Sequence, residues 1–242
     1  MKALARWLLL LAVAFLALQL FFVGRIALMV VVAPESTAFQ RSEVWRVARE
    51  GKHGLRWRQQ WVPYARISDH LKRAVIASED DGFVYHDGVD WDAVEKAWQR
   101  NSKAEEQAAK RALAGKARPP KVVGGSTITQ QLAKNLFLSG ERTLVRKGQE
   151  VVLTFALEVL LSKQRILEIY LNSVEWGEGV FGAEAAAQHY YRKSASKLTP
   201  YEAARLAVML PRPRHYEKLP GSEYLSSRAQ VIVGRMPSAE LP

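Results

Sequence analysis

An uncharged, apolar segment near the N-terminus constrains this chain more than any other feature. From Trp7 to Gly24 no side chain is charged, and Gln19 is the single strongly polar one. A membrane-spanning helix needs roughly 20 apolar residues, and this segment is just long enough, with Arg25 at its far interface. The apolar core of a cleaved signal peptide is shorter, roughly 7–15 residues, and a small-x-small cleavage site follows it. We therefore favour an uncleaved single-pass anchor.

The charges around this segment predict its orientation. Lys2 and Arg6 precede it, which places the N-terminus in the cytoplasm and everything after about Pro34 on the outer side of the cytoplasmic (inner) membrane, in the periplasm. The chain carries a net charge of +11, which suits an anionic membrane surface, a polyanion or a phosphorylated substrate. Nucleic acid is excluded as a partner because the anchor puts the domain on the wrong side of the membrane.

Beyond the anchor the pattern is helical. The chain contains no cysteine, so no disulfide and no cysteine-ligated zinc site can form. No strand alternation of any length is visible, and the fold class is therefore mostly α. We divide the chain into a cytoplasmic N-terminus and anchor (1–33), a membrane-proximal connector (34–66) and a main domain (67–242). The spacing of apolar residues predicts helices over 68–77, 89–98, 126–138, 141–150, 151–161, 163–172, 183–191, 199–210 and 222–236.

The segment 101–120 differs in amino-acid composition from its surroundings. It is rich in Ala, Lys, Arg and Glu and has almost no large apolar residue. Such a segment buries little surface, so we expect a mobile or marginally helical connector. Because it lies between two motif-bearing stretches, we hypothesise that it forms a flap over a cleft.

The acidic stretch from Ser78 to Gly88 is the first candidate for chemistry. It follows a predicted half-buried helix, so Glu79 should lie where that helix ends. Burial of a carboxylate raises its pKa and makes it a better base near neutral pH. The alternative is an ordinary solvated acidic turn, which composition alone favours.

Two downstream stretches supply polar and cationic groups. In GGSTITQQLAKN, Ser126 or Thr127 can cap a helix whose polar face and free N–H groups suit an oxyanion, although an ordinary amphipathic helix has the same spacing. In ERTLVRKGQE, three cations precede Glu150, and the apolar run 151–161 after it predicts a central buried helix. Glu150 should stay ionised among these cations, in either a structural or a catalytic ion pair.

Taken together, the motifs resemble those of a known family. EDDGFVYHDG, GGSTITQQLAKN, RKGQE, KQRILEIYLN and LTPYEAARLAVMLP occur in the order found in peptidoglycan glycosyltransferases (glycosyltransferase family 51) and cover about Glu79 to Pro211. The resemblance implies a lysozyme-like fold with a small membrane-associated lobe. It implies polymerisation of lipid II into glycan strands for the cell wall, by inverting transfer with release of undecaprenyl pyrophosphate. Because little chain follows Pro211, we expect a monofunctional member.

The same resemblance implies roles for single residues. Glu79 corresponds to the general base that deprotonates the acceptor hydroxyl, and Glu150 to a second essential acid. A pyrophosphate leaving group is a weak base, so it needs charge stabilisation more than a general acid. We assign substrate binding to Asp80, Ser126, Thr127, Gln130, Gln131, Lys134, Asn135, Arg142, Arg146 and Lys147.

Cofactors, partners and rival functions complete the expectations. No dedicated metal-ligand set is visible, so no metal-binding residue is assigned, although a divalent cation (Mg²⁺ or Mn²⁺) could share the pyrophosphate charge. The expected partners are lipid II, the growing glycan chain, the lipid bilayer and cell-wall synthesis or division proteins. A lytic or hydrolytic muramidase would share the fold and a catalytic Glu without needing the cation cluster. A non-enzymatic binding module would not need Glu79, Lys147 and Glu150.

Overall fold

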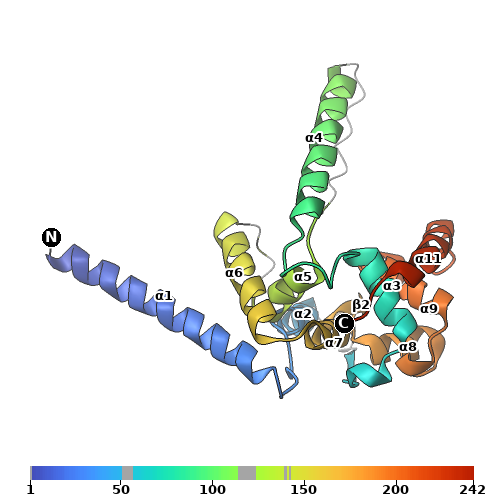
Figure 1. Ribbon diagram of the computed structural model, residues 1–242, viewed down its shortest axis with the longest axis horizontal. Coiled ribbons are helices and arrows are strands. Elements are labelled where there is room, and N and C mark those ends of the chain that lie inside the picture. The colour runs from blue at the N-terminus through green and yellow to red at the C-terminus, as the bar shows by residue number, and fades with distance from the viewer. Residues whose placement is uncertain (1, 51–56, 114–123, 139–140, 142) are drawn as a thin grey trace.

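The computed structural model describes residues 2–50, 57–113, 124–138, 141 and 143–242. Its first element is the long helix α1 (Lys2–Leu28), which projects from the body of the molecule with the N-terminus at its far end (Figure 1). Among the described residues it is the one helix that is long and apolar enough to cross a membrane. Most of its large apolar side chains are exposed, as expected for an anchor surrounded by lipid rather than protein.

The body is mostly α-helical, as its sequence pattern predicts. Its centre is α3 (Asp69–Glu79), which packs against α9 (Pro200–Met209) and α11 (Glu223–Arg235). On α3 the side chains of Leu71, Ala74 and Val75 are fully buried. Ser68 caps the helix by accepting a hydrogen bond from the backbone N–H of His70. The end of α3 is thereby fixed on a rigid core, and Glu79 is its last residue.

A second group of helices packs beside this core. It consists of α5 (Ile128–Phe137), which contacts α6 (Leu144–Leu160), α7 (Lys163–Ser173) and α2 (Ala38–Glu50). The remaining helical elements are α8 (Ala183–Tyr191), α10 (Pro213–Tyr216) and the 3₁₀ turns Tyr64–Arg66, Ala195–Lys197 and Met236–Ser238.

A small sheet joins the connector to the main domain, which sequence patterning did not predict. Strand β3 (Val180–Phe181) lies between β1 (Arg58–Gln59), which is parallel to it, and β2 (Glu175–Gly177), which is antiparallel. Strands of two or three residues are too short to show alternation, so the sequence pattern did not indicate them, and the mostly α fold class is confirmed. The proposed division into 1–33, 34–66 and 67–242 stays a prediction.

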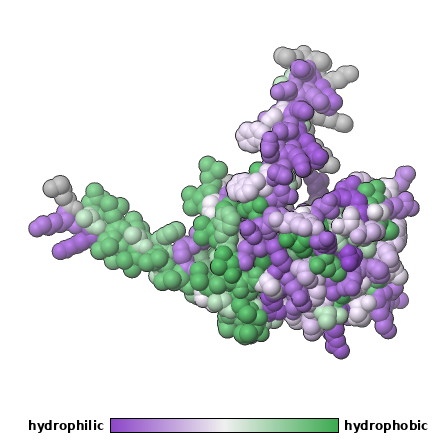
Figure 2. Space-filling model, viewed as in Figure 1, coloured by the Kyte–Doolittle hydropathy of each residue, from purple (hydrophilic) through white to green (hydrophobic). Residues whose placement is uncertain are grey.

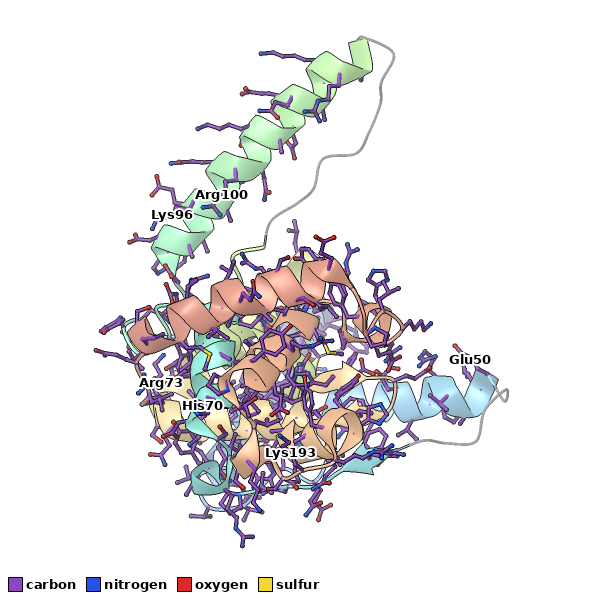
Figure 3. All side chains as sticks on the ribbon, turned by 90° about the vertical axis from the view of Figure 1, so that its right-hand side faces the viewer. Glu50, His70, Arg73, Lys96, Arg100 and Lys193 are labelled. Carbon is purple, nitrogen blue, oxygen red and sulfur yellow. The ribbon has the colours of Figure 1, made fainter. Side chains whose placement is uncertain are left out.

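The segment after residue 100 also differs from expectation. Helix α4 (Trp91–Leu113) continues well past the predicted end at residue 98 and stands clear of the body (Figures 1 and 3). Lys96 and Arg100 lie on the part nearest the body (Figure 3). Ala, Glu, Lys and Arg are strong helix formers, so this composition forms a helix without tertiary contacts. The flap hypothesis stays untested, and residues 114–120 of that segment lie outside the described residues.

Helix α6 joins the two helices that were predicted over 141–150 and 151–161, and it is not the fully buried helix expected from its apolar sequence. Val152 and Val159 are 49 % and 82 % exposed. Figure 2 shows the hydrophobic surface of α1 continuing over neighbouring elements of the body, and α6 packs against α1. The apolar run of α6 predicted a helix buried in protein, but part of this run faces outward beside the anchor.

Candidate active site

A cleft of about 540 Å³ lies where α5 and α6 face α2 and β2. It brings together most of the residues that the sequence singled out. The predicted residues that line it are Ser126, Gln130, Gln131, Lys134, Asn135, Arg146, Lys147 and Glu150.

Glu79 adjoins the cleft through Gln131. The Nε2 of Gln131 donates a hydrogen bond to Oε2 of Glu79 at 3.0 Å, and the buried hydroxyl of Tyr170 donates to Oε1 of Gln131, also at 3.0 Å. An ionised carboxylate only accepts hydrogen bonds, so the amide nitrogen of Gln131 faces Glu79 and the amide oxygen accepts from Tyr170. Among the described residues no hydrogen bond is formed to the other carboxylate oxygen of Glu79, Oε1, which leaves it free to accept a proton.

The surroundings of Glu79 favour a base. Burial raises the pKa of Glu79, and the nearby charge of Asp80 raises it further. The hydrogen bond from Gln131 and the charge of Lys134 oppose this rise. Burial in turn lowers the pKa of Lys134, while Glu150 and Glu79 raise it. Lys134 therefore interacts electrostatically with both candidate acids, which connects the two ends of the site.

Glu150 has a very different environment. It is buried, and Nη1 of Arg146 donates to its Oε2 at 2.8 Å while Nζ of Lys147 donates to its Oε1. Both cations belong to the same helix, one turn before Glu150, so the spacing in the sequence predicted this cluster. Glu150 thus holds two cations at the cleft wall, and its own charge is compensated by them.

Asp80 and Thr127 are buried beside the cleft and bond to the protein itself. Oδ2 of Asp80 accepts a hydrogen bond from the backbone N–H of Ile128 at 2.9 Å, and Oδ1 lies 2.8 Å from Nε2 of His86. The Nδ1 of His86 accepts from the N–H of Gly88, so the neutral ring donates through Nε2 to Asp80. Asp80 therefore connects the end of α3 to the start of α5, and His86 supports this local structure.

The start of α5 is fixed by a capping box. Thr127 Oγ1 accepts from the N–H of Gln130, and Oε1 of Gln130 accepts from the N–H of Thr127. The Thr127 hydroxyl also donates to the carbonyl of Gly88 at 2.6 Å. Thr127, rather than Ser126, is thus the cap, and the polar atoms of Thr127 and Gln130 hold the helix in place. Arg142 lies outside the described residues.

Sequence reasoning missed Glu175, which also lines the cleft. This carboxylate is buried, and burial raises the pKa of Glu175 to about 7 against the opposing influence of Arg214. The Nε of Arg214 donates to both carboxylate oxygens of Glu175, at 2.9 and 3.2 Å, and Nη2 of Arg214 also pairs with Glu43 of α2. Glu175 lies between Val174 and Trp176, so only the distant partner Arg214, which no local pattern indicates, would have revealed it.

The carboxylates of the cleft do not form a metal-binding set. Among the described residues no group of three His, Cys, Asp or Glu side chains could hold a metal ion. Both oxygens of Glu150 are already paired with cations. The arrangement instead combines a basic carboxylate at one end with a cationic wall at the other, which suits transfer of a group from an anionic leaving group.

Comparisons with known proteins agree with this geometry. The sequence model of the transglycosylase family matches residues 48–237. A biosynthetic peptidoglycan transglycosylase of Paraburkholderia phytofirmans is 53% identical over 96% of this chain and 90% of its own. A protein of the same name from Herminiimonas arsenicoxydans is 52% identical over 100% of this chain and 99% of its own. A third, from Burkholderia orbicola, is 52% identical over 99% of this chain and 94% of its own. The chain therefore belongs to the transglycosylase family, whose domain is consistent with the mostly α, lysozyme-like architecture described above.

Proposed function

We propose that this protein is a peptidoglycan glycosyltransferase that polymerises lipid II into glycan strands. The acceptor hydroxyl attacks the anomeric carbon of the lipid-linked donor, the configuration inverts, and undecaprenyl pyrophosphate leaves. The observation that carries the proposal is the pairing of Glu79, a half-buried carboxylate with one free oxygen, with the cationic cleft wall around Lys134. The names of the relatives support it.

Glu79 acts as the general base. As the new bond forms between the acceptor oxygen and the anomeric carbon, Oε1 of Glu79 takes the hydroxyl proton. Gln131 donates to Oε2 and, held by Tyr170, keeps the carboxylate oriented. Because burial raises the pKa of Glu79, the carboxylate is a stronger base than an exposed glutamate, and such positioned bases contribute typically 10²–10⁴-fold.

The cations act on the leaving group. When the bond between the anomeric carbon and the pyrophosphate oxygen breaks, that oxygen keeps the electron pair and carries new negative charge. Lys134, Arg146 and Lys147 stabilise this charge, and Glu150 holds Arg146 and Lys147 in place. A divalent cation would have to be held mainly by the pyrophosphate itself, as Mg²⁺ commonly is, and we assign no step to it.

The proposed location follows from the anchor and the substrate. A single apolar helix fits a membrane anchor, and we place it in the bacterial inner membrane with the N-terminus cytoplasmic and the catalytic domain periplasmic. A lipid-linked substrate then reaches the cleft from the same bilayer. Cell-wall synthesis or division proteins are the proposed protein partners.

Incubation of the full-length protein with lipid II in detergent or lipid vesicles tests this function. We expect glycan polymer and released undecaprenyl pyrophosphate, and we expect Glu79→Gln to make neither. Asp81→Asn is a matched control, since Asp81 is an exposed carboxylate two residues away that pairs with Arg235. Digestion of preformed glycan without polymer formation would instead indicate a lytic or hydrolytic enzyme and would refute the proposal.

A further inference from the structure

The anchor helix is docked on the domain along one face of its last turns. Gln19, Phe22 and Ile26 recur at intervals that place them on the same side of α1, and Met29 follows directly after the helix ends. Ile26 and Met29 are buried, and Phe22 packs edge-to-face on Phe137 of α5 with ring centroids 5.4 Å apart. This end of the anchor therefore packs against the domain, in addition to being joined to it through the chain.

An amide pair forms part of this contact. The Nε2 of Gln19 donates to Oε1 of Gln149 at 3.2 Å, and Nε2 of Gln149 donates to Oε1 of Gln19 at 2.9 Å. Each amide thus satisfies the other as both donor and acceptor. A polar amide in apolar surroundings costs free energy unless it is hydrogen-bonded. Each glutamine therefore removes the cost of placing the other in this contact.

Gln149 lies within an apolar stripe on α6, as Gln19 does on α1. Val145 and Val152, four residues before and three after Gln149, are 85 % and 49 % exposed. Apolar stripes in lipid pack without a hydrophobic driving force and without a unique rotation, whereas hydrogen bonds are directional. Among the contacts between α6 and the anchor, the amide pair is therefore the directional one, and it adds to the packing of α6 on α5.

That rotation sets the orientation of the cationic wall. Glu150 directly follows Gln149, and successive residues are about 100° apart around a helix of 3.6 residues per turn. While Gln149 points to α1, Glu150 points into the cleft with Arg146 and Lys147. A small rotation of α6 would move all three groups relative to the leaving group.

We propose that Gln19 is a positioning residue: α6 already packs on α5, and the amide pair of Gln19 with Gln149 fixes the remaining freedom of rotation so that Glu150, Arg146 and Lys147 face the cleft. The anchor then helps to position the groups of the active site, in addition to holding the domain at the membrane. The expected fall in kcat rests on the proposed polymerisation of lipid II. The contact between Gln19 and Gln149 does not depend on that function.

A double-mutant cycle tests the lock. Full-length wild type, Gln19→Leu, Gln149→Leu and the double variant are compared in phosphatidylethanolamine–phosphatidylglycerol vesicles, with kcat and KM for lipid II and the thermal midpoint measured. We expect each single variant to lose roughly three- to tenfold in kcat with little change in KM, in line with the strength of hydrogen bonds between membrane helices. The double variant should be as slow as one single variant. Gln99→Leu, on α4, is the matched control.

Rescue by a covalent link separates positioning from simple stability. The chain has no cysteine, so Gln19→Cys with Gln149→Cys creates its sole thiol pair. We expect this variant to be slow when reduced and to recover to within about twofold of wild type when joined by a short bifunctional thiol reagent. Wild-type kcat in the single variants, losses that multiply in the double variant, or a linked pair that stays slow would each overturn the proposal.

The two proposals fail in different ways. Crosslinking of the cysteine pair requires no substrate, so its absence in vesicles would refute the contact between Gln19 and Gln149 whatever the activity. If the cysteine variant crosslinks while the wild-type protein makes no polymer from lipid II, the contact stands and the proposed function is refuted instead.

Discussion

Glu79 and Glu150 are two carboxylates at one site with opposite surroundings. Glu79 accepts one hydrogen bond from a neutral amide, and burial raises the pKa of Glu79. Glu150 is buried as well, but it is held by Arg146 and Lys147. A neutral donor leaves a carboxylate basic, whereas two cations compensate its charge. Two acids within one cleft are thus suited to different tasks, proton transfer for Glu79 and placement of cations for Glu150.

The largest expected effect is on Glu79. Replacing Glu79 by Gln keeps its shape and removes the base, so we expect the initial rate of lipid II polymerisation to fall at least about a hundredfold. The thermal midpoint should not fall at pH 7.5. Because the folded-state pKa of Glu79 is raised, ionisation costs stability as the pH rises above the unfolded value, and Gln avoids that cost. A markedly lower midpoint would show that Glu79 is structural instead.

Glu150→Gln should show the opposite balance to Glu79→Gln, with a smaller loss of rate and a clear loss of stability. We expect a smaller loss of rate, roughly ten- to a hundredfold, because the cations lose their orientation while the base remains. The free energy of unfolding should fall by about 1–3 kcal/mol, since Arg146 and Lys147 lose a buried charged partner and Lys147 is partly exposed to solvent. Denaturant unfolding measures this change. If Glu150→Gln were as stable as wild type and slower than Glu79→Gln, the two roles would be reversed.

Tyr170→Phe sharpens the role of Gln131. Without the tyrosine hydroxyl, the Gln131 side chain loses the hydrogen bond that holds it in position beside Glu79, and we expect kcat to fall roughly three- to tenfold. Tyr64→Phe is the matched control, because the buried hydroxyl of Tyr64 has no hydrogen-bond partner among the described residues. Equal rates in the two variants would remove Tyr170 from the site.

The smallest expected effect on the rate is that of Glu175, for which the prediction concerns stability. Its folded-state pKa of about 7 lies above the unfolded value of 4.5, so the folded protein binds the extra proton between these pH values. Stability from this group is present below pH 4.5 and is lost as the pH rises to 7. Glu175→Gln should therefore gain about 2–3 kcal/mol relative to wild type on going from pH 5 to pH 8. Urea unfolding at both pH values measures the difference, and an equal difference at both would contradict the raised pKa.

Local patterns predicted the parts of the site that lie within single helices. A cap at Ser126 or Thr127 and the cations one turn before Glu150 follow from short sequence intervals, and the structure selects Thr127 as the cap. The pairing of Glu175 with Arg214 spans 39 residues and depends on how β2 and α10 meet, so no local pattern contained it. The sequence did not indicate that one side of α6 faces outward, because an apolar residue is compatible with either protein or lipid surroundings.

The pH dependence of kcat/KM on the acidic side tests the base role of Glu79 most directly. In a Glu175→Gln background, which removes the other raised carboxylate of the cleft, we expect the acidic inflection to lie above the ordinary glutamate pKa of 4.5. Gln131→Leu removes the hydrogen bond that lowers the pKa of Glu79, so the inflection should move to higher pH in that variant. An inflection at 4.5, or a shift to lower pH in Gln131→Leu, would contradict a general-base role for Glu79.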